Sequence, residues 1–165
     1  MMKQLIIVRH AKSDWGNPDL KDFDRPLNKR GKTNAPEMAH RLVKLNIKPQ
    51  LIVSSPALRA LTTAKFFADT WQMPLAEIKE EPKIYEANVN TLLKVINNFD
   101  NNYNQIAMFG HNPGFTDLVN YLDGHIYEMP TCSVAILEFP FDDWAMISEG
   151  TAKVVLFDYP KSGDD

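Results

Sequence analysis

The stretch Leu5-Ile6-Ile7-Val8-Arg9-His10 decides the fold, because an apolar run of strand character ends at an arginine followed by a histidine. The same construction recurs at Leu51-Ile52-Val53-Ser54, before Ser55-Pro56, and at Ile106-Ala107-Met108-Phe109, before Gly110-His111. In an open sheet flanked by helices, ligands bind just beyond the carboxyl ends of the strands. The three junctions therefore predict an α/β fold with its functional site at one edge of the sheet.

Helices are expected directly after the second and third of these strands. The residues from Ala57 to Trp71 follow a helical pattern, with Ser55 as the N-cap and Pro56 as the first helical residue. After the third strand, Asn112 is the expected cap and Pro113 the expected first residue. The apolar residues of this helix recur with the spacing i, i+3, i+4, i+7, at Phe115, Leu118, Val119 and Leu122.

The strand ends and the first turn of the Ala57–Trp71 helix carry the side chains that we expect to form the functional site, namely Arg9, His10, Arg59 and His111. Helix N-termini beside them also favour anions. We expect the guanidinium charges to lower the pKa of His10 from its usual value of about 6.5, which leaves a neutral imidazole that can attack phosphorus. Fixed arginine donors would stabilise charge on the phosphoryl oxygens, so the pattern predicts phosphoryl transfer without a metal ion or other cofactor.

The segments between these strands predict further helices. One lies within Lys29 to Leu45, where Pro36 interrupts the helical pattern. Asn34 with Glu37 three residues later resembles a capping box, so the regular helix is expected to begin near Asn34, after a bent first turn. Another helix is indicated by periodic apolar residues between Val89 and Phe99.

The remaining segments have strand character. A short strand is expected near Ile78, and three more at Val134 to Phe139, Trp144 to Ser148 and Ala152 to Asp158, with Glu149-Gly150 as a hairpin turn between the last two. Together with the earlier alternation of strands and helices, these segments predict an α/β three-layer sandwich. Its mostly parallel central sheet is flanked by helices and includes an antiparallel edge.

Length and composition limit the class of protein. At 165 residues and 44% hydrophobic content, the chain suits one domain spanning residues 1–165. The formal net charge of −3 offers no general basic surface for nucleic acid, and no apolar stretch reaches the length of a membrane span. The first residues lack a signal-peptide pattern, so a cytoplasmic protein is expected. The single cysteine, Cys132, excludes an internal disulfide framework and is expected to be buried.

Three motifs, in this order, resemble the histidine phosphatase superfamily, also called phosphoglycerate mutase-like: Arg9-His10, Ser54 to Ala60, and Gly110 to Pro113. Asp24-Arg25-Pro26-Leu27, the sequence Gly-His-Asn-Pro-Gly and the short length are similar to its SixA-type phosphohistidine phosphatase branch. The resemblance runs over nearly the whole chain and implies a phosphoglycerate mutase-like fold. The first motif has Ala11 where the superfamily usually has glycine, and alanine carries a cost if the backbone there needs a positive φ.

The resemblance also implies a role for each matching residue. His10 is the implied nucleophile that accepts the phosphoryl group, and Arg9, Arg59 and His111 would hold the phosphoryl oxygens. Glu86 stands where many superfamily members carry the proton donor for the leaving group. Water would then hydrolyse the phosphohistidine intermediate, with the same carboxylate as the base.

Some side chains have two interpretations from sequence alone. Glu86 is either the proton donor or a plain solvated carboxylate. Ser13 either binds the substrate phosphate or caps a turn. Arg25 either reaches the substrate from the rim of the site or only pairs with Asp22 or Asp24.

For other residues we favour a structural role over a functional one. A metal site formed by His10 and His111 with Asp14 or Asp117 matches no metal-binding spacing, and the neighbouring arginines would repel a cation. His40 and His125 are expected at the surface or in packing. The tryptophans are also expected to be packing residues: Trp15, Trp71 and Trp144.

Three functions are compatible with this pattern. The first is a phosphatase acting through a covalent phosphohistidine, with phosphohistidine on a phosphorylated protein as the substrate. The second is a phosphatase of the same superfamily that acts on a small phosphorylated molecule. The third is a phosphate-binding module without turnover. None of the three requires a nucleic acid or membrane partner.

Overall fold

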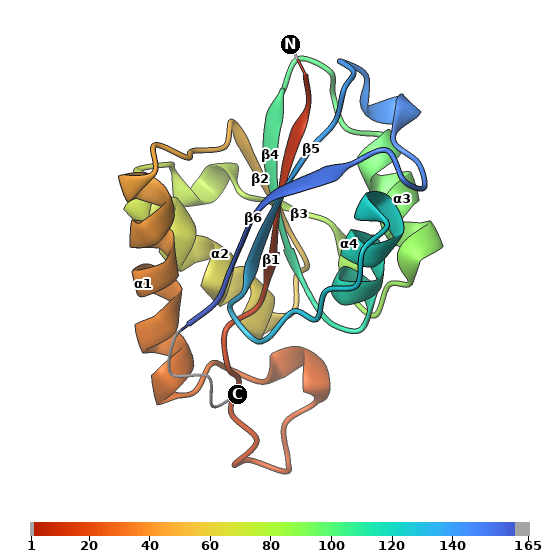
Figure 1. Cartoon of the computed structure of the whole chain (residues 1–165). Coiled ribbons are helices and arrows are strands. Elements are labelled where there is room, and N and C mark those ends of the chain that lie inside the picture. The colour runs from red at the N-terminus through yellow and green to blue at the C-terminus, as the bar shows by residue number, and fades with distance from the viewer. Residues whose placement is uncertain (1, 161–165) are drawn as a thin grey trace.

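A single six-stranded sheet forms the centre of the computed structural model, which describes residues 2–160, and its strand order is β3-β2-β4-β1-β5-β6 (Figure 1). The strands are β1 (Gln4–Arg9), β2 (Leu51–Ser54), β3 (Lys79–Glu80), β4 (Gln105–Gly110), β5 (Val134–Glu138) and β6 (Lys153–Asp158). The neighbours from β3 to β1 pair in parallel, whereas β5 pairs antiparallel with both β1 and β6. The predicted mostly parallel sheet with an antiparallel edge is confirmed.

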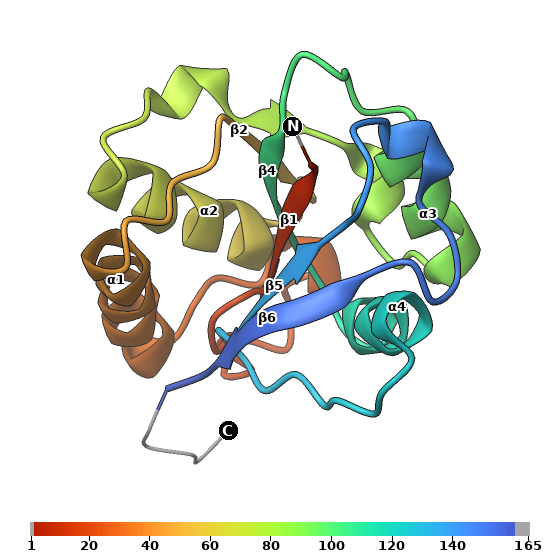
Figure 2. The same ribbon diagram turned by 45° about the horizontal axis from the view of Figure 1, so that its top comes forward.

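Helices cover both faces of this sheet. One face carries α1 (Lys29–Lys44) and α2 (Leu58–Thr70), and the other carries α3 (Val89–Asn97) and α4 (Gly114–Asp123), as Figures 1 and 2 show. Short 3₁₀ helices lie in the connections: η1 (Asp22–Asp24), η2 (Leu75–Glu77), η3 (Pro82–Ile84) and η4 (Trp144–Met146). The predicted three-layer α/β sandwich is confirmed.

The central strand β1 is buried on both faces, which explains its continuous apolar run. Leu5 and Ile7 belong to the core packed around α3 and α4, whereas Ile6 and Val8 belong to the core packed around α1 and α2. The side chains of a strand alternate between the two faces of a sheet, so one run of four apolar residues serves both cores. This burial fixes the register that places Arg9 opposite Gly110 of β4.

The backbone pairing continues past the ends of the strands. The amide of His10 donates to the carbonyl of Gly110 at 3.0 Å, and the amide of Ser55 donates to the carbonyl of Phe109 at 3.0 Å. The segments that follow β1, β2 and β4 therefore leave the sheet side by side. This arrangement brings the three strand-end motifs of the sequence to one place.

Helix α1 begins earlier than the sequence pattern predicts. It starts at Lys29, because the Asn28 side chain accepts a hydrogen bond from the Gly31 amide at 2.8 Å and caps the helix there. Pro36 lies inside the helix, and Asn34 is a buried helical residue rather than a cap. The apolar stripe of α1 packs against the sheet on both sides of the proline, at Ala35, Met38, Ala39 and Leu42.

Helix α2 begins two residues later than predicted, and helix α4 begins one residue later. Helix α2 begins at Leu58, because Ala57 keeps an extended ψ of 138° and the Ser55 hydroxyl accepts from the Ala57 amide at 3.2 Å, before the helix. Helix α4 begins at Gly114. Asn112 still provides a capping bond, since its side-chain oxygen accepts from the Thr116 amide at 3.1 Å.

The predicted strand at Trp144 to Ser148 is wrong. This segment contains η4, which begins where the Asp143 side chain accepts from the Ala145 amide at 3.0 Å. Trp144 is fully buried, and its indole N–H donates to the Tyr103 carbonyl at 2.8 Å, so it anchors this connection in the core. Glu149-Gly150 consequently does not join two strands; Gly150, with φ of 71°, turns the chain toward β6.

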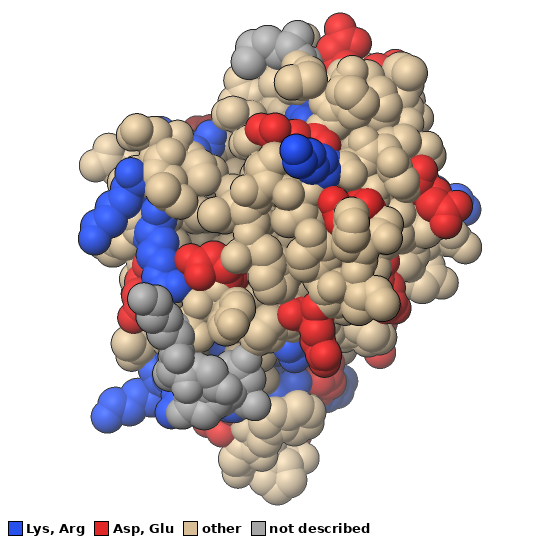
Figure 3. All heavy atoms as spheres, in the orientation of Figure 1, with Lys and Arg blue, Asp and Glu red and all other residues tan. Residues whose placement is uncertain are grey.

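Charged side chains of both signs are interspersed on the face shown in Figure 3. Basic side chains gather over α1, which carries Lys29, Arg30, Lys32, Arg41 and Lys44. Among residues 2–160, no helix combines the length and the apolar content that crossing a membrane requires.

Candidate active site

Four side chains line one cleft of about 390 Å³ at the carboxyl ends of the central strands. Arg9 is the last residue of β1 and His10 follows it, Arg59 lies in the first turn of α2, and His111 follows β4. The imidazole rings of His10 and His111 are 5.3 Å apart between centroids. The structure therefore brings together the arginines and histidines that the three strand-end motifs single out.

His10 is held with one ring nitrogen available to a substrate. Its Nδ1 lies 2.7 Å from the Ala11 carbonyl oxygen, which can only accept, so Nδ1 carries the proton and Nε2 keeps its lone pair. Burial lowers the pKa of His10 to about 3, with smaller contributions from His111, Arg59 and Arg9, although the Ala11 hydrogen bond acts in the opposite direction. The arginines, which the sequence predicts to keep His10 neutral, lower its pKa less than burial does.

Ala11 meets no backbone penalty in this position. Among the described residues other than glycine, those with positive φ are Asn46, Gln72, Glu86 and Cys132. Ala11 is fully buried in the core beside α1 and α2, and its amide donates to the Thr63 hydroxyl at 3.0 Å. Alanine thus fits where the superfamily pattern has glycine.

His111 is oriented by a serine from the end of β2. Its Nε2 lies 2.8 Å from the Ser55 hydroxyl oxygen, and both residues are buried. Burial, followed by the charge of Arg59, lowers the pKa of His111 to about 4, so the ring is neutral at physiological pH. Its Nδ1 is buried and finds no hydrogen-bond partner among residues 2–160, which leaves this atom for a ligand.

Arg59 and Arg25 share the carboxylate of Asp22, which lies in η1. The Arg59 guanidinium donates to the Asp22 backbone carbonyl at 2.7 Å and to Asp22 Oδ2 at 3.0 Å, and Arg25 Nε donates to Oδ1 at 3.2 Å. The Tyr85 hydroxyl donates to Oδ2 at 2.6 Å. Burial acts to raise the pKa of Asp22, but the hydrogen bonds from Tyr85 and Arg59 prevail and lower it to about 2. Asp22 is therefore a permanent anion that positions both arginines.

Asp22, Ser55 and Tyr85 were not predicted as part of the site. In the sequence Asp22 is only a possible partner of Arg25, Ser55 is the expected helix cap, and nothing marks Tyr85. Their contacts join segments 37, 56 and 63 residues apart, between Arg59 and Asp22, His111 and Ser55, and Tyr85 and Asp22. Residue type and local spacing give no signal for contacts of this range.

A family model described as histidine phosphatase superfamily (branch 1) matches residues 5–112, which include every one of these residues. The chain belongs to the histidine phosphatase superfamily. Two curated relatives are uncharacterized proteins. One is a chloroplastic protein of Arabidopsis thaliana, 31% identical over 86% of this chain and 69% of its own length. The other, from Mycobacterium tuberculosis, is 30% identical over 93% of this chain and its full length.

Three solved structures share the fold. SixA from Agrobacterium tumefaciens is 24% identical, has a TM-score of 0.80, and the match covers 96% of this chain and 98% of that one. The protein histidine phosphatase SixA complexed with tungstate is 22% identical with a TM-score of 0.81, over 95% and 97%. Mycobacterial glucosyl-3-phosphoglycerate phosphatase is 15% identical with a TM-score of 0.67, over 97% and 100%. The family and the fold together support a phosphatase.

The rim of this histidine phosphatase site is formed by the segment between β1 and α1. Arg25 is buried, and its Nη1 donates to the Ser13 hydroxyl at 2.7 Å. Ser13, Arg25 and Trp15 all line the cleft. Arg25 thus pairs with Asp22, as one interpretation predicts, and also borders the cleft; contact with substrate stays a prediction. The Ser13 hydroxyl accepts the Arg25 hydrogen bond at the edge of the cleft, and its binding of a substrate phosphate stays a prediction.

The tryptophans differ from one another. Trp71 and Trp144 are buried, as expected of packing residues, but Trp15 is 76% exposed, so the prediction that it is a packing residue is wrong. Its ring lies over the Arg25 guanidinium, with Cζ 3.5 Å from the ring centroid. His40 is exposed, and so is His125, whose Nδ1 lies 2.7 Å from a carboxylate oxygen of Asp123.

Glu86 lies at an adjoining cleft of about 500 Å³, which Arg59 and His111 also line. It is exposed and has a φ of 55°. The structure thus places its carboxylate beside the histidine and arginine cluster rather than on a remote surface. Both sequence interpretations of Glu86, the proton donor and the solvated carboxylate, remain compatible with this position.

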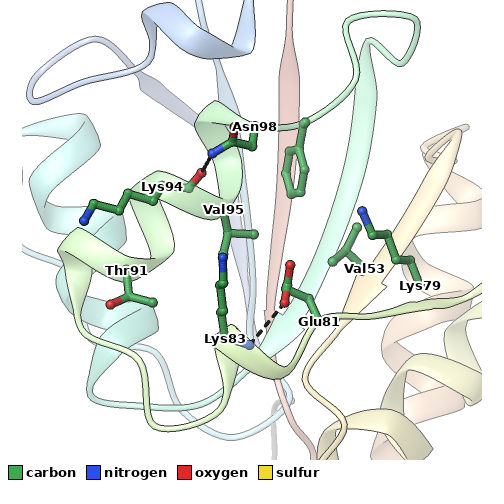
Figure 4. A pocket seen from close by; sticks show the side chains of 9 residues that line it. Val53, Lys79, Glu81, Lys83, Thr91, Lys94, Val95 and Asn98 are labelled. Carbon is green, nitrogen blue, oxygen red and sulfur yellow. Dashed lines mark hydrogen bonds between the residues drawn. The ribbon is translucent and has the colours of Figure 1, made fainter.

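Two other features do not offer a competing site for this chemistry. Within residues 2–160, no three or more His, Cys, Asp or Glu side chains are grouped so that they could hold a metal ion. A groove of about 560 Å³ between β3 and α3 is lined by Lys79, Lys83 and Lys94, but by neither histidine nor arginine (Figure 4). The strand-end cleft remains the candidate active site.

Proposed function

We propose that this histidine phosphatase is a metal-independent phosphohydrolase that forms a covalent phosphohistidine on His10. The observation that carries the proposal is the neutral His10 ring, with Nδ1 bound to the Ala11 carbonyl and Nε2 facing a cleft lined by Arg9, Arg59 and His111. An imidazole with a free lone pair is a nucleophile at physiological pH. Burial and the adjacent cations maintain that state.

In the first step, His10 Nε2 attacks phosphorus and the bond from phosphorus to the leaving group breaks. Charge spreads over the three equatorial phosphoryl oxygens, which the arginine guanidiniums stabilise as fixed donors. We assign the Ser55 hydroxyl, 2.8 Å from His111 Nε2, as the donor of the hydrogen bond between them, so that the unpartnered Nδ1 of His111 carries a proton and donates to a phosphoryl oxygen. Arg9 is held for this task by its hydrogen bond to the Met129 carbonyl at 2.8 Å.

In the second step, water attacks the phosphorus of phospho-His10, inorganic phosphate leaves, and the ring recovers its lone pair. Glu86 is the group that we assign to protonate the leaving group first and to take the proton of the attacking water afterwards. Its position in the adjoining cleft beside Arg59 and His111 supports this assignment. No step requires a metal ion or another cofactor.

We propose phosphohistidine on a phosphorylated protein as the substrate. A P–N bond makes less demand on the proton donor than a phosphate ester does, which suits an exposed Glu86. The shared fold with SixA structures supports the same substrate. A small phosphorylated molecule is the second candidate, because the fold is also that of glucosyl-3-phosphoglycerate phosphatase.

Hydrolysis in the presence of chelator tests the proposal. The purified protein with EDTA is incubated with a histidine-phosphorylated protein and with a panel of small phosphate esters, and released phosphate is measured. We expect the highest kcat/KM on the phosphohistidine protein, no activity for His10→Ala, and normal activity for His40→Ala, which removes an exposed histidine of α1. Activity that disappears with chelator would contradict the mechanism, and preference for an ester would favour the second candidate.

A further inference from the structure

The most exposed aromatic side chain beside the active site is Trp15. It lies in the segment between β1 and α1, which projects beyond the carboxyl ends of the strands at the bottom of Figure 1. The ring is 76% exposed, although tryptophan is usually buried over most of its surface. It nevertheless lines the same cleft as His10 and His111. An exposed indole at the mouth of a polar cleft calls for a function other than core packing.

Trp15 is held in place at this mouth. One face of the indole covers the Arg25 guanidinium at 3.5 Å, a cation–π contact. The Arg25 guanidinium is itself held by two residues. It donates to the Ser13 hydroxyl, and its Nε and Nη2 lie 3.2 Å and 3.1 Å from Asp22 Oδ1. The ring therefore rests on an immobilised support, while its exposed surface remains available to a ligand.

The contacts continue from this ring to the phosphoryl-binding side chains. Asp22 binds Arg25 through Oδ1 and Arg59 through Oδ2, so Trp15, Arg25, Asp22 and Arg59 form one connected wall. Three members of this connected set line the cleft of about 390 Å³ together with the two histidines: Trp15, Arg25 and Arg59. A group attached directly to a phosphoryl group bound at the histidines would extend into the cleft that Trp15 also lines.

We propose that Trp15 forms an aromatic subsite that stacks on a flat ring bonded directly to the phosphoryl group. This inference rests on the proposed function and deepens it, because the imidazole of phosphohistidine is such a ring. A planar π system stacks on an indole face, whereas an alkyl chain or a bare phosphoryl group gains no comparable contact. Trp15 then discriminates between substrates by their leaving groups, and Arg25 supports the stacking surface.

Two inert ligands test the subsite without relying on turnover. Phenylphosphonate carries a flat ring directly on phosphorus, methylphosphonate carries none, and neither is hydrolysed at its P–C bond. Binding of each is measured by isothermal titration calorimetry to the wild-type protein, to Trp15→Ala and to Trp15→Phe. Ile126→Ala serves as the control, because Ile126 is 94% exposed and lines neither cleft of the site.

We expect the wild-type protein and Ile126→Ala to bind phenylphosphonate about ten-fold more tightly than methylphosphonate. Trp15→Ala should lose this preference while methylphosphonate binding is unchanged, and Trp15→Phe should retain most of it. Equal affinities in the wild-type protein would overturn the subsite but leave the proposed function intact. An equal loss for both ligands in Trp15→Ala would also overturn it, since Trp15 would then act only by holding Arg25. Failure of the wild-type protein to bind either ligand would refute the phosphoryl pocket and the subsite together.

Discussion

Replacing Ser55 by alanine should lower catalysis through the orientation of His111, in addition to lowering the stability of the fold. Ser55 is fully buried; its hydroxyl accepts from the Ala57 amide and pairs with His111 Nε2 at 2.8 Å. Without it, two buried polar groups lose a partner, which should destabilise the fold by about 1–3 kcal/mol. In the proposed mechanism this hydroxyl donates to Nε2, which favours the tautomer with a proton on Nδ1. A net contribution of about 1–1.5 kcal/mol from this hydrogen bond shifts the ratio of the two His111 tautomers about ten-fold.

The matched control is Ser54→Ala. Ser54 is equally buried, and its hydroxyl donates to the Ser55 carbonyl at 2.9 Å without contacting either histidine. We expect both variants to lose stability in urea unfolding. Only Ser55→Ala should lose about ten-fold in kcat/KM and show, in ¹⁵N spectra of histidine, a shift of His111 toward the Nε2-protonated tautomer. Equal kcat/KM in the two variants, or an unchanged His111 tautomer in Ser55→Ala, would refute the reasoning.

Three further predictions concern pH, packing and the proton donor. The folded-state pKa values of about 3 for His10 and 4 for His111 lie below the unfolded value of about 6.5, so the unfolded chain binds more protons and stability falls as pH decreases through 6.5. Each histidine should lower the free energy of unfolding by about 2 kcal/mol between pH 7.5 and pH 5. In urea unfolding, His111→Gln should therefore lose less stability over this pH range than the wild-type protein. Gly110→Ala would place a methyl group against the side chains of Phe115 and Ile84, and should destabilise the protein by about 1–3 kcal/mol in the same assay. The control is Gly16→Ala, whose methyl group would meet only the exposed Asp14 side chain. It should change stability by less than about 0.5 kcal/mol. Glu86→Gln should lower kcat on an alkyl phosphate by about 100-fold or more and on phosphohistidine far less, and equal effects on the two substrates would remove Glu86 from the role of proton donor.

The parts of the fold that local pattern determines could be predicted from the sequence. Strands β1, β2 and β4 are buried on both faces, so their continuous apolar runs and their ends stand out. Helices α3 and α4 have clear apolar periodicity. The meeting of Arg9-His10 with Gly110-His111 followed from the rule that parallel strands end at the same edge.

The predictions that the structure corrects concern features that depend on long-range contacts or on competing side-chain hydrogen bonds. The beginning of α1 is set by Asn28, and tertiary packing retains Pro36 inside the helix against its local preference. Trp144 has strand propensity, but its burial and its hydrogen bond to the Tyr103 carbonyl place it in a 3₁₀ helix. The burial of His10, which dominates its pKa, is likewise a property of the folded molecule.

The phosphoryl-enzyme itself provides the most direct test of the central claim. Rapid mixing of the enzyme with a ³²P-labelled phosphohistidine substrate, followed by alkaline quenching and peptide mapping, should reveal an acid-labile, alkali-stable adduct on the peptide that contains His10. The adduct should form before phosphate is released and should be absent in His10→Ala. Turnover without any labelled enzyme, or label that persists on another residue in His10→Ala, would contradict the account.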